Sequence, residues 1–377
     1  MFSYSPLLSW IMAEMNLTYA QAGFILPTSI LMIILLRIPW GLLSDRIGFK
    51  LTMGLAITIM SFSGLSRGFA VNYWMLLMLE TLFGAGVAAI MPCLPKLAAA
   101  WFPHEELGLA TGIYVAGFSI GNMFGLSVTP YVLALLGTWR RIFLVYGLFG
   151  VVLALVWWVT AKEPTNDQTS LTNKAKQNTS LWRDLAAIVR MREAWILTGL
   201  FLCTMGSYDT ICIWLPSILQ LKGVPSVTAG LIAAMLPLGF LVASTTIGVL
   251  SDWAGLRKPF LWILGLISGP AILTIEKAQS TLLWGTVFLS GFCTMGIMTL
   301  VLMILSELPE IARFVASASG WISSLANIGS LIMPAVVGYV KDVTGSFLLG
   351  VTMIAVIAEA TLVLGLMIKE TGRKSIL

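Results

Sequence analysis

The chain has 377 residues, of which 58% are hydrophobic and 10% are charged, and its formal net charge is +5. A soluble domain carries about 25% charged residues, so this composition excludes an ordinary soluble protein and indicates a membrane protein. The basic residues are scattered among the loops and form no stripe with aromatic partners, which argues against a nucleic-acid partner.

Eleven apolar runs are long enough to cross a membrane, because a hydrocarbon core of ~30 Å needs about 20 apolar residues in a helix. In chain order these runs cover residues 19–43, 51–69, 73–101, 108–136, 141–161, 195–220, 227–250, 259–275, 280–305, 314–340 and 346–368. A further run, Phe2–Met12, is too short to cross. The pattern predicts an all-α polytopic membrane protein.

One connection between the runs is long. It begins with a polar stretch, Glu163–Ser180, that is typical of a flexible linker. In Leu181–Arg192, apolar residues recur at helical spacing between charges, which favours an amphipathic helix on the membrane surface over a water-exposed start of the next span. The predicted units are therefore an N-terminal bundle (1–161), a cytoplasmic linker (162–194), a C-terminal bundle (195–368) and a cytoplasmic tail (369–377).

A short charged turn occurs twice, once in each half of the chain. Gly41–Lys50 (GLLSDRIGFK) separates two apolar runs, and Gly248–Lys258 (GVLSDWAGLRK) does the same further along. This repeat predicts two six-helix bundles related by pseudo-two-fold symmetry, an arrangement typical of transporters. Aligned in this way, the first helix of the chain is truncated. We favour an apolar extension upstream of Met1 over a genuine half-helix, because a short helix would end within hydrocarbon.

The loops differ in their basic residues from one side of the membrane to the other. Most of the Lys and Arg residues lie on the side of Gly41–Lys50, and fewer, among them Arg67 and Arg140, lie on the opposite side. Cytoplasmic loops carry the excess of Lys and Arg. We therefore expect a multi-pass protein of the plasma membrane, surrounded by the lipid bilayer and monomeric, with its C-terminus in the cytoplasm.

Neither a metal site nor a cofactor is predicted. The four cysteines lie inside apolar runs without any CxxC pair, and His104 is the only histidine. An enzyme would need a nucleophile with its base, or a set of metal ligands, and the sequence suggests neither.

The first turn resembles the signature that joins the second and third helices in the major facilitator superfamily, Gly-x-Leu-x-Asp-Arg-x-Gly followed by basic residues. The matching positions are Gly41, Asp45, Arg46, Gly48 and Lys50, with Asp252 in a weaker second copy. The resemblance covers essentially the whole chain and implies two bundles that rock around a central site. It also implies that Asp45 faces the start of a helix in the other half and latches one conformation; otherwise Asp45 merely shapes the turn.

Two further motifs depart from those of the superfamily. Glu80 stands where the fourth helix usually has an arginine, so the usual role of that arginine does not carry over. In the fifth helix the glycines keep the spacing of efflux antiporters, but Asn122 replaces their proline, which favours uptake over efflux. Gly121-Asn122-Met123, together with Arg37–Gly41, resembles nitrate/nitrite porters and cyanate-permease relatives.

Ionisable groups inside spans cost about 2.5–3.5 kcal/mol on insertion scales and are candidates for function. Arg37 is a candidate ligand for a substrate anion or a member of a structural ion pair. Asp209 is a candidate carrier of a coupling proton, because burial disfavours its charged form, or a satisfied structural carboxylate. Glu80 has the same two interpretations. Glu359, in the last span, is expected to be a packing or interface residue.

Other polar and aromatic residues complete the predicted site. Asn122 and Asn327 occupy near-equivalent positions in the two halves and are candidates for hydrogen bonds to substrate or between helices. Tyr208 and Trp214 are candidates for lining a substrate cavity, although membrane aromatics more often fill the core or lie at interfaces.

These features favour a secondary active transporter that works by alternating access and takes up a small solute, such as an anion or carboxylate, together with protons. A multidrug or metabolite efflux antiporter is the alternative within the superfamily. A membrane sensor or enzyme is the alternative outside it.

Overall fold

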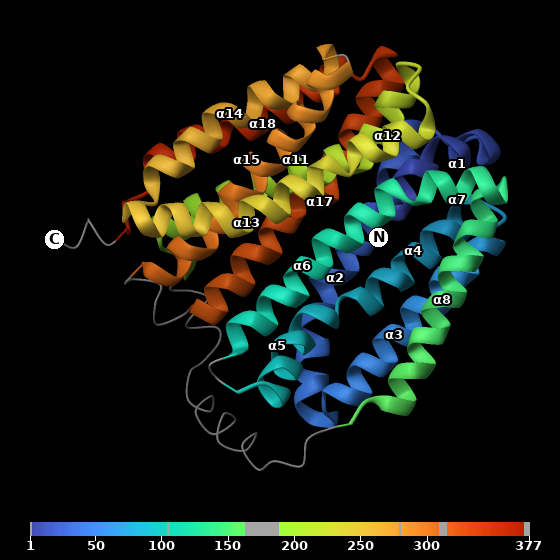
Figure 1. Ribbon diagram of the computed structural model, residues 1–377, viewed down its shortest axis with the longest axis horizontal. Helices are drawn as coiled ribbons and strands as arrows, with labels where there is room; N and C mark the ends of the chain where they lie inside the picture. Colours follow the sequence, from blue (N-terminus) through green and yellow to red (C-terminus); the bar gives the residue numbers. More distant parts are fainter. Residues whose placement is uncertain (1, 104–105, 163–187, 279, 309–314, 373–377) are drawn as a thin grey trace.

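Figure 1 shows the computed structural model, which describes residues 2–103, 106–162, 188–278, 280–308 and 315–372. In this part of the chain, 11 helical segments are long and apolar enough to cross a membrane, in agreement with the sequence prediction. The predicted amphipathic helix over Leu181–Arg192 lies mostly outside the described residues. Of its described part, Ile188 is buried in the core of the C-terminal bundle.

The N-terminal bundle begins with a short 3-10 helix, η1, and the short helix α1, so its first helix is much shorter than its counterpart α11. The elements of this bundle are η1 (Phe2–Leu7), α1 (Leu8–Met15), α2 (Tyr19–Ile47), α3 (Phe49–Ser66), η2 (Arg67–Phe69), α4 (Tyr73–Val87), α5 (Ile90–Trp101), α6 (Leu107–Ser127), α7 (Thr129–Leu136) and α8 (Trp139–Thr160). Helices α4 and α5 form one span, and α6 and α7 form another.

The C-terminal bundle repeats this plan. Its elements are α11 (Arg192–Leu221), α12 (Ser226–Ala233), α13 (Met235–Ala254), α14 (Lys258–Lys277), α15 (Ser280–Glu307), α17 (Val315–Thr344) and α18 (Leu348–Met367). The packing is also repeated, since α2 packs on α4 and α3 on α8 in the first bundle, as α13 packs on α15 and α14 on α18 in the second. The fold is thus the predicted all-α pair of bundles.

Both repeated turns reverse the chain at a glycine with a positive φ. Gly48 has φ 84° between α2 and α3, and Gly255 has φ 68° after α13. Side chains with a Cβ rarely adopt these conformations, so glycine allows α2 to end and α3 to begin within one residue. The start of α2 is fixed by a capping box in which Thr18 and Gln21 satisfy each other's backbone N–H groups.

The two bundles meet at one end of the molecule. Figure 1 shows α1 and α7 of the N-terminal bundle next to α12 of the C-terminal bundle, whereas α5 and α13 lie apart at the opposite end. Helix α2 packs along α17, and α6 along α12 and α13, so both contacts cross from one bundle to the other. We call the end at which α2 begins the Tyr19 end, and the end at which α2 terminates the Asp45 end.

Within a bundle, close helix packing depends on particular glycines. A Cβ at Gly84 of α4 would lie 2.3 Å from the Cα of Ser29 in α2, so no other residue fits without moving one of the helices.

We predict that Gly84→Ala lowers the free energy of unfolding by about 1–3 kcal/mol through overpacking. Gly121→Ala is the matched control, because a Cβ at Gly121 meets nothing within 4 Å. Thermal unfolding of both variants in detergent tests this, and equal midpoints would contradict the predicted packing.

Candidate functional site

The contact between α2 and α17 at the Tyr19 end is made directly by the two backbones. A Cβ at Gly23 would lie 2.5 Å from the carbonyl oxygen of Pro334, and one at Gly338 would lie 2.3 Å from the carbonyl oxygen of Tyr19. Since neither glycine has a side chain, the helices approach until their backbones touch. We call this region (Tyr19, Gly23, Trp214, Pro334 and Gly338) the Tyr19-end contact.

Trp214 of α11 fixes this contact from the side. Its side chain is fully buried, and its indole Nε1 donates a hydrogen bond of 2.9 Å to the carbonyl oxygen of Pro334. Its ring lies 5.8 Å from that of Tyr19 and 5.2 Å from that of Phe347, centroid to centroid. Trp214 was predicted to line a substrate cavity; in this conformation it lies inside the closed contact.

Two other contacts join the bundles at the same end. A Cβ at Gly230 of α12 would lie 2.5 Å from the carbonyl oxygen of Leu126 in α6. The hydroxyl of Ser9 in α1 donates a hydrogen bond of 2.6 Å to Gln220 at the end of α11. The Tyr19 end is therefore closed by α1, α2 and α6 of the N-terminal bundle together with α11, α12 and α17 of the C-terminal bundle.

Arg37 lies on α2, further toward the Asp45 end. Its Nη1 donates a long hydrogen bond of 3.4 Å to the hydroxyl of Ser323 on α17, across the two bundles. Its Nε is buried without a hydrogen-bond partner. No carboxylate in the described part of the chain lies within ion-pair distance of Arg37, so the structural ion pair is not formed there.

A line of polar residues follows the face of α17 that includes the Arg37 contact. Ser323, Asn327 and Ser330 recur at the spacing of three to four residues that places side chains on one face of a helix. Asn327 donates from Nδ2 to the carbonyl oxygen of Ser323 at 2.7 Å. From Ser323 to Ser330 this polar face extends about 10 Å along the helix axis.

Asp209 of α11 lies at the other end of this polar face. Its carboxylate faces the hydroxyl of Ser330, whose side chain is fully buried. Among the described residues, no basic side chain forms an ion pair with Asp209. An acid without a cation partner inside a membrane span can lose its charge by binding a proton.

The structure thus brings three predicted residues, Arg37, Asn327 and Asp209, to a single face of α17. Ser323 and Ser330 belong to the same face but were not predicted as site residues; their spacing from Asn327 was the available signal. Tyr208 does not join them, since it is buried against Phe240 of α13 with ring centroids 6.2 Å apart. The half-buried Asn122 lies on α6, not on α17 or α11.

Glu80 has a different environment from Asp209. It is fully buried in α4, and its Oε2 lies 2.9 Å from Nη2 of Arg67. The hydroxyl of Ser29 in α2 donates to its other oxygen, and the Arg67 guanidinium lies 4.2 Å from the centre of the Phe83 ring. Arg67, expected in a loop, is buried here, and the ion pair connects α2, α4 and the end of α3.

A cavity of about 590 Å³ adjoins this ion pair between α3 and α8. Arg67 and Phe83 form part of its wall, and the rest is mostly apolar, including Trp157 and Leu153 of α8. Its wall contains no residue of α11 or α17, so this cavity is separate from the candidate site.

Asp45 at the first repeated turn is bound within its own bundle. Its carboxylate lies 2.7 Å from Nζ of Lys96 on α5, and the same Nζ lies 3.1 Å from the carbonyl oxygen of Gly41. Arg46 is exposed, and the carbonyl of Lys50 accepts a hydrogen bond from Trp157 of α8. In this conformation Asp45 and Gly41 of the turn therefore join α2 to Lys96 of α5.

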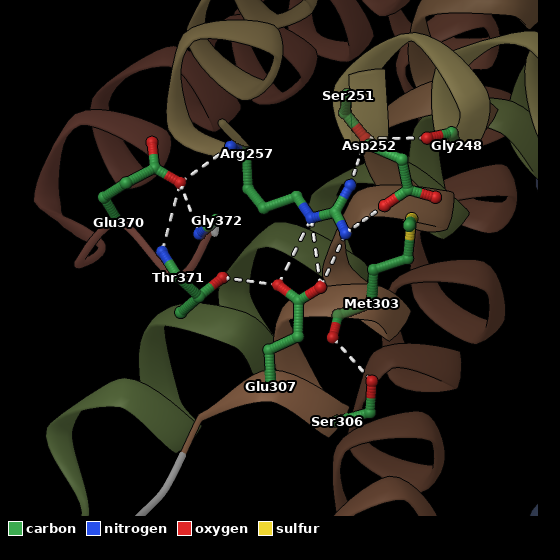
Figure 2. A network of polar contacts seen from close by, with 10 residues as sticks. All are labelled: Gly248, Ser251, Asp252, Arg257, Met303, Ser306, Glu307, Glu370, Thr371 and Gly372. Carbon is green, nitrogen blue, oxygen red and sulfur yellow. Dashed lines mark hydrogen bonds and ion pairs between the residues drawn. The ribbon is translucent and has the colours of Figure 1, made fainter. Parts of the chain in front are cut away.

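The second turn carries a larger network, shown in Figure 2. Arg257 binds Asp252 of the same turn, and its Nη2 lies 2.6 Å from Glu307 at the end of α15. The hydrogen bonds to Glu307 raise the pKa of Arg257. In the first turn an acid, Asp45, binds a base on α5. In the second turn a base, Arg257, binds an acid on α15. Each turn is thus joined by an ion pair to a helix of its own bundle, but the acid and the base have exchanged places.

The chain after α18 completes this network. Glu370 accepts hydrogen bonds from the backbone N–H groups of Arg257 (2.7 Å) and Lys258 (3.0 Å), and so caps the start of α14. Thr371 donates to Glu307 at 2.9 Å. The second turn is thereby tied to α14, α15 and the residues after α18, all within the C-terminal bundle.

The contribution of the Arg67–Glu80 ion pair to the stability of the N-terminal bundle can be tested by substitution. Arg67→Met leaves Glu80 buried without its cation, and removing one partner of a buried pair costs about 3–5 kcal/mol. We predict a clear fall in the thermal midpoint for this variant, and recovery of most of it in Arg67→Met/Glu80→Gln, which removes both charges. Thermal unfolding measures both. A single variant as stable as the parent would show that the pair does not hold the bundle.

Comparisons with known proteins agree with this architecture. The family model described as Major Facilitator Superfamily matches residues 1–334. The chain is 23% identical to a D-galactonate transporter of Escherichia coli O6:H1, over 88% of this chain and 83% of that one. It is 27% identical to a sialic acid transporter of Escherichia coli K12, over 84% and 76% respectively.

Among solved structures, the fold is similar to a bacterial homolog of the human lysosomal transporter Spinster in an inward-facing, unoccupied conformation. The TM-score is 0.76 and the identity 17%, over 97% of this chain and 91% of that one. The family match covers most of the chain, and its helices form the two-bundle fold. The chain belongs to the Major Facilitator Superfamily and is a multi-pass membrane transporter of a small solute.

Proposed function

We propose that this transporter takes up a small carboxylate together with a proton, with Arg37 binding the carboxylate and Asp209 carrying the proton. The proposal is carried by the environment of Arg37. Its Nε is buried without a hydrogen-bond partner, and among the described residues it has no acidic neighbour. A guanidinium in this state offers the paired N–H donors that a carboxylate accepts.

The α17 polar face supports a substrate that also carries hydroxyl groups. Ser323, Asn327 and Ser330 supply neutral donors and acceptors along about 10 Å, next to the guanidinium. The named substrates of the two relatives, D-galactonate and sialic acid, both combine a carboxylate with several hydroxyls. We therefore propose a sugar acid or a similar hydroxylated carboxylate, and Asn122 remains a further candidate contact.

Asp209 is the better candidate for proton coupling. It lies beside a hydroxyl and has no basic partner in the described chain, so protonation alone changes its charge. Glu80 is already neutralised by Arg67 at 2.9 Å, and releasing it requires breaking a buried ion pair. We propose that protonation of Asp209 removes a negative charge near the incoming carboxylate and so favours its binding.

We further propose that the Asp45 end faces the cytoplasm of a cell membrane and that this conformation is inward-facing. The excess of Lys and Arg on that side supports the orientation, with the C-terminus in the cytoplasm. The closed Tyr19-end contact and the pairing of Asp45 with Lys96 support the conformation. We propose that the protein works as a monomer in the bilayer, with Trp214 closing the outer side rather than binding substrate.

A thermal-shift screen tests the substrate class. Purified protein is mixed with D-galactonate, sialic acid, a hexuronate and, as the neutral comparison, galactose. A ligand that binds the folded state raises the thermal midpoint. Stabilisation by the acids and not by galactose supports the proposal, whereas stabilisation by neutral or cationic compounds alone points to another substrate, including those of an efflux antiporter.

Asp209 is tested by separating accumulation from exchange. In proteoliposomes with an inward proton gradient, we predict that Asp209→Asn loses uphill accumulation of the acid found in the screen but still exchanges it across the membrane, because the amide binds no coupling proton. Glu359→Gln is the matched control, since Glu359 lies in α18 against Gly269, away from the site. Normal uphill uptake by Asp209→Asn would refute its role.

Arg37 is tested by a substitution that keeps its charge. We predict that Arg37→Lys weakens binding of the acid about tenfold, because lysine cannot form the bidentate pair. Arg141→Lys, at an exposed position, is expected to bind as tightly as the parent. Isothermal titration calorimetry measures both, and unchanged affinity in Arg37→Lys would assign Arg37 to structure alone.

A further inference from the structure

A carboxylate from one bundle lies on the start of a helix in the other. Asp342 is near the end of α17, and its two oxygens accept hydrogen bonds from the backbone N–H groups of Tyr19 (2.9 Å) and Ala20 (2.7 Å). These are the first two residues of α2. The hydrogen bonds therefore run directly between the C-terminal and N-terminal bundles.

The first turn of a helix has N–H groups without partners in the helix, and its partial positive charge favours an anion. At the start of α2, Thr18 already satisfies Gln21 through the local capping box. Asp342 takes two of the N–H groups that the capping box leaves free. The start of α2 thus depends on a residue more than 300 positions away in the chain.

In the part of the chain that the structure describes, the hydrogen-bond partners of Asp342 are these two backbone N–H groups. Its neighbour Lys341 donates to the carbonyl oxygen of Gly345, and its Nζ lies 5.5 Å from the centre of the Tyr19 ring and 5.2 Å from that of Phe347. Within the described residues, Asp342 forms no salt bridge. Asp342 lies on the exposed rim of the contact, where water competes for its oxygens, so its effect is expected to be moderate.

Helices α2 and α17 are antiparallel, since Tyr19 meets Asp342 and Arg37 meets Ser323. Each has an aspartate close to its C-terminal end, Asp45 on α2 and Asp342 on α17. In this structure Asp342 reaches across to the other bundle, whereas Asp45 binds Lys96 within its own. The end that carries the crossing carboxylate is the end that is closed.

We propose that Asp342 is a positioning residue of the transport cycle, whose carboxylate on the start of α2 holds the Tyr19 end closed and must leave when that end opens. The proposal rests on alternating access between the bundles, but not on the identity of the substrate or on proton coupling. It predicts that removing the carboxylate shifts the population toward the state that is open at the Tyr19 end.

The opening can be measured at a buried reporter. Leu126 is fully buried in the closed end, where its carbonyl contacts Gly230 of the other bundle, so we expect Leu126→Cys to react with a maleimide faster when the bundles separate there. The reaction is followed in nanodiscs by peptide mass spectrometry, which separates position 126 from the native cysteines and needs no substrate. We expect Asp342→Ala to raise the labelling rate roughly three- to tenfold.

Two variants separate positioning from general stability. Asp342→Glu keeps a carboxylate and is expected to return the labelling rate close to that of the parent. Asn72→Ala removes a helix cap inside one bundle, where Asn72 accepts from the N–H of Met75 at 2.9 Å, and is expected to lower the thermal midpoint without raising labelling. Unchanged labelling in Asp342→Ala, or an equal rise in Asn72→Ala, would overturn the proposal.

Discussion

The backbone contact between α2 and α17 determines where the other candidate residues lie. Gly23 and Gly338 let the helices touch at the Tyr19 end, and Trp214 holds them there through the carbonyl of Pro334. Once the helices are in contact at this end, the polar face of α17 runs along α2 until Ser323 reaches Arg37. Tight packing of small residues at one end thus positions a charged side chain far from it.

The buried charges of this protein fall into two groups with different consequences. Glu80 with Arg67, and Arg257 with Glu307, are neutralised within a single bundle, so they stiffen that bundle and need not change when the bundles move. Arg37 and Asp209 lack such partners in the described chain; Arg37 reaches Ser323 of the other bundle, and Asp209 faces Ser330 of α17. Ionisable groups left without an ion-pair partner inside a membrane protein are the ones available to a substrate or a proton.

The spans and their two-fold arrangement could be predicted because a long apolar run is a local property of the sequence. Arg37, Asp209 and Asn327 could be singled out one by one, since polar groups in such runs are rare. Their common position on α17 could not, because it depends on which helices face each other across the bundles. The partner of Glu80 was missed for a related reason: Arg67 ends an apolar run and resembles a loop residue, although its side chain turns inward.

Because α2 is held at the Tyr19 end, a rotation of this helix about that contact moves its far end the most. Asp45 is 22 residues beyond Gly23, which corresponds to about 33 Å along a helix. A rotation of about 10° around the glycine contact would therefore move the Asp45 end by roughly 6 Å, about the width of a small sugar, by simple geometry on that helix length. Because the contact lies near one end of the molecule, a small rotation of the helix about it can open a passage at the opposite end. No helix has to unfold for this movement.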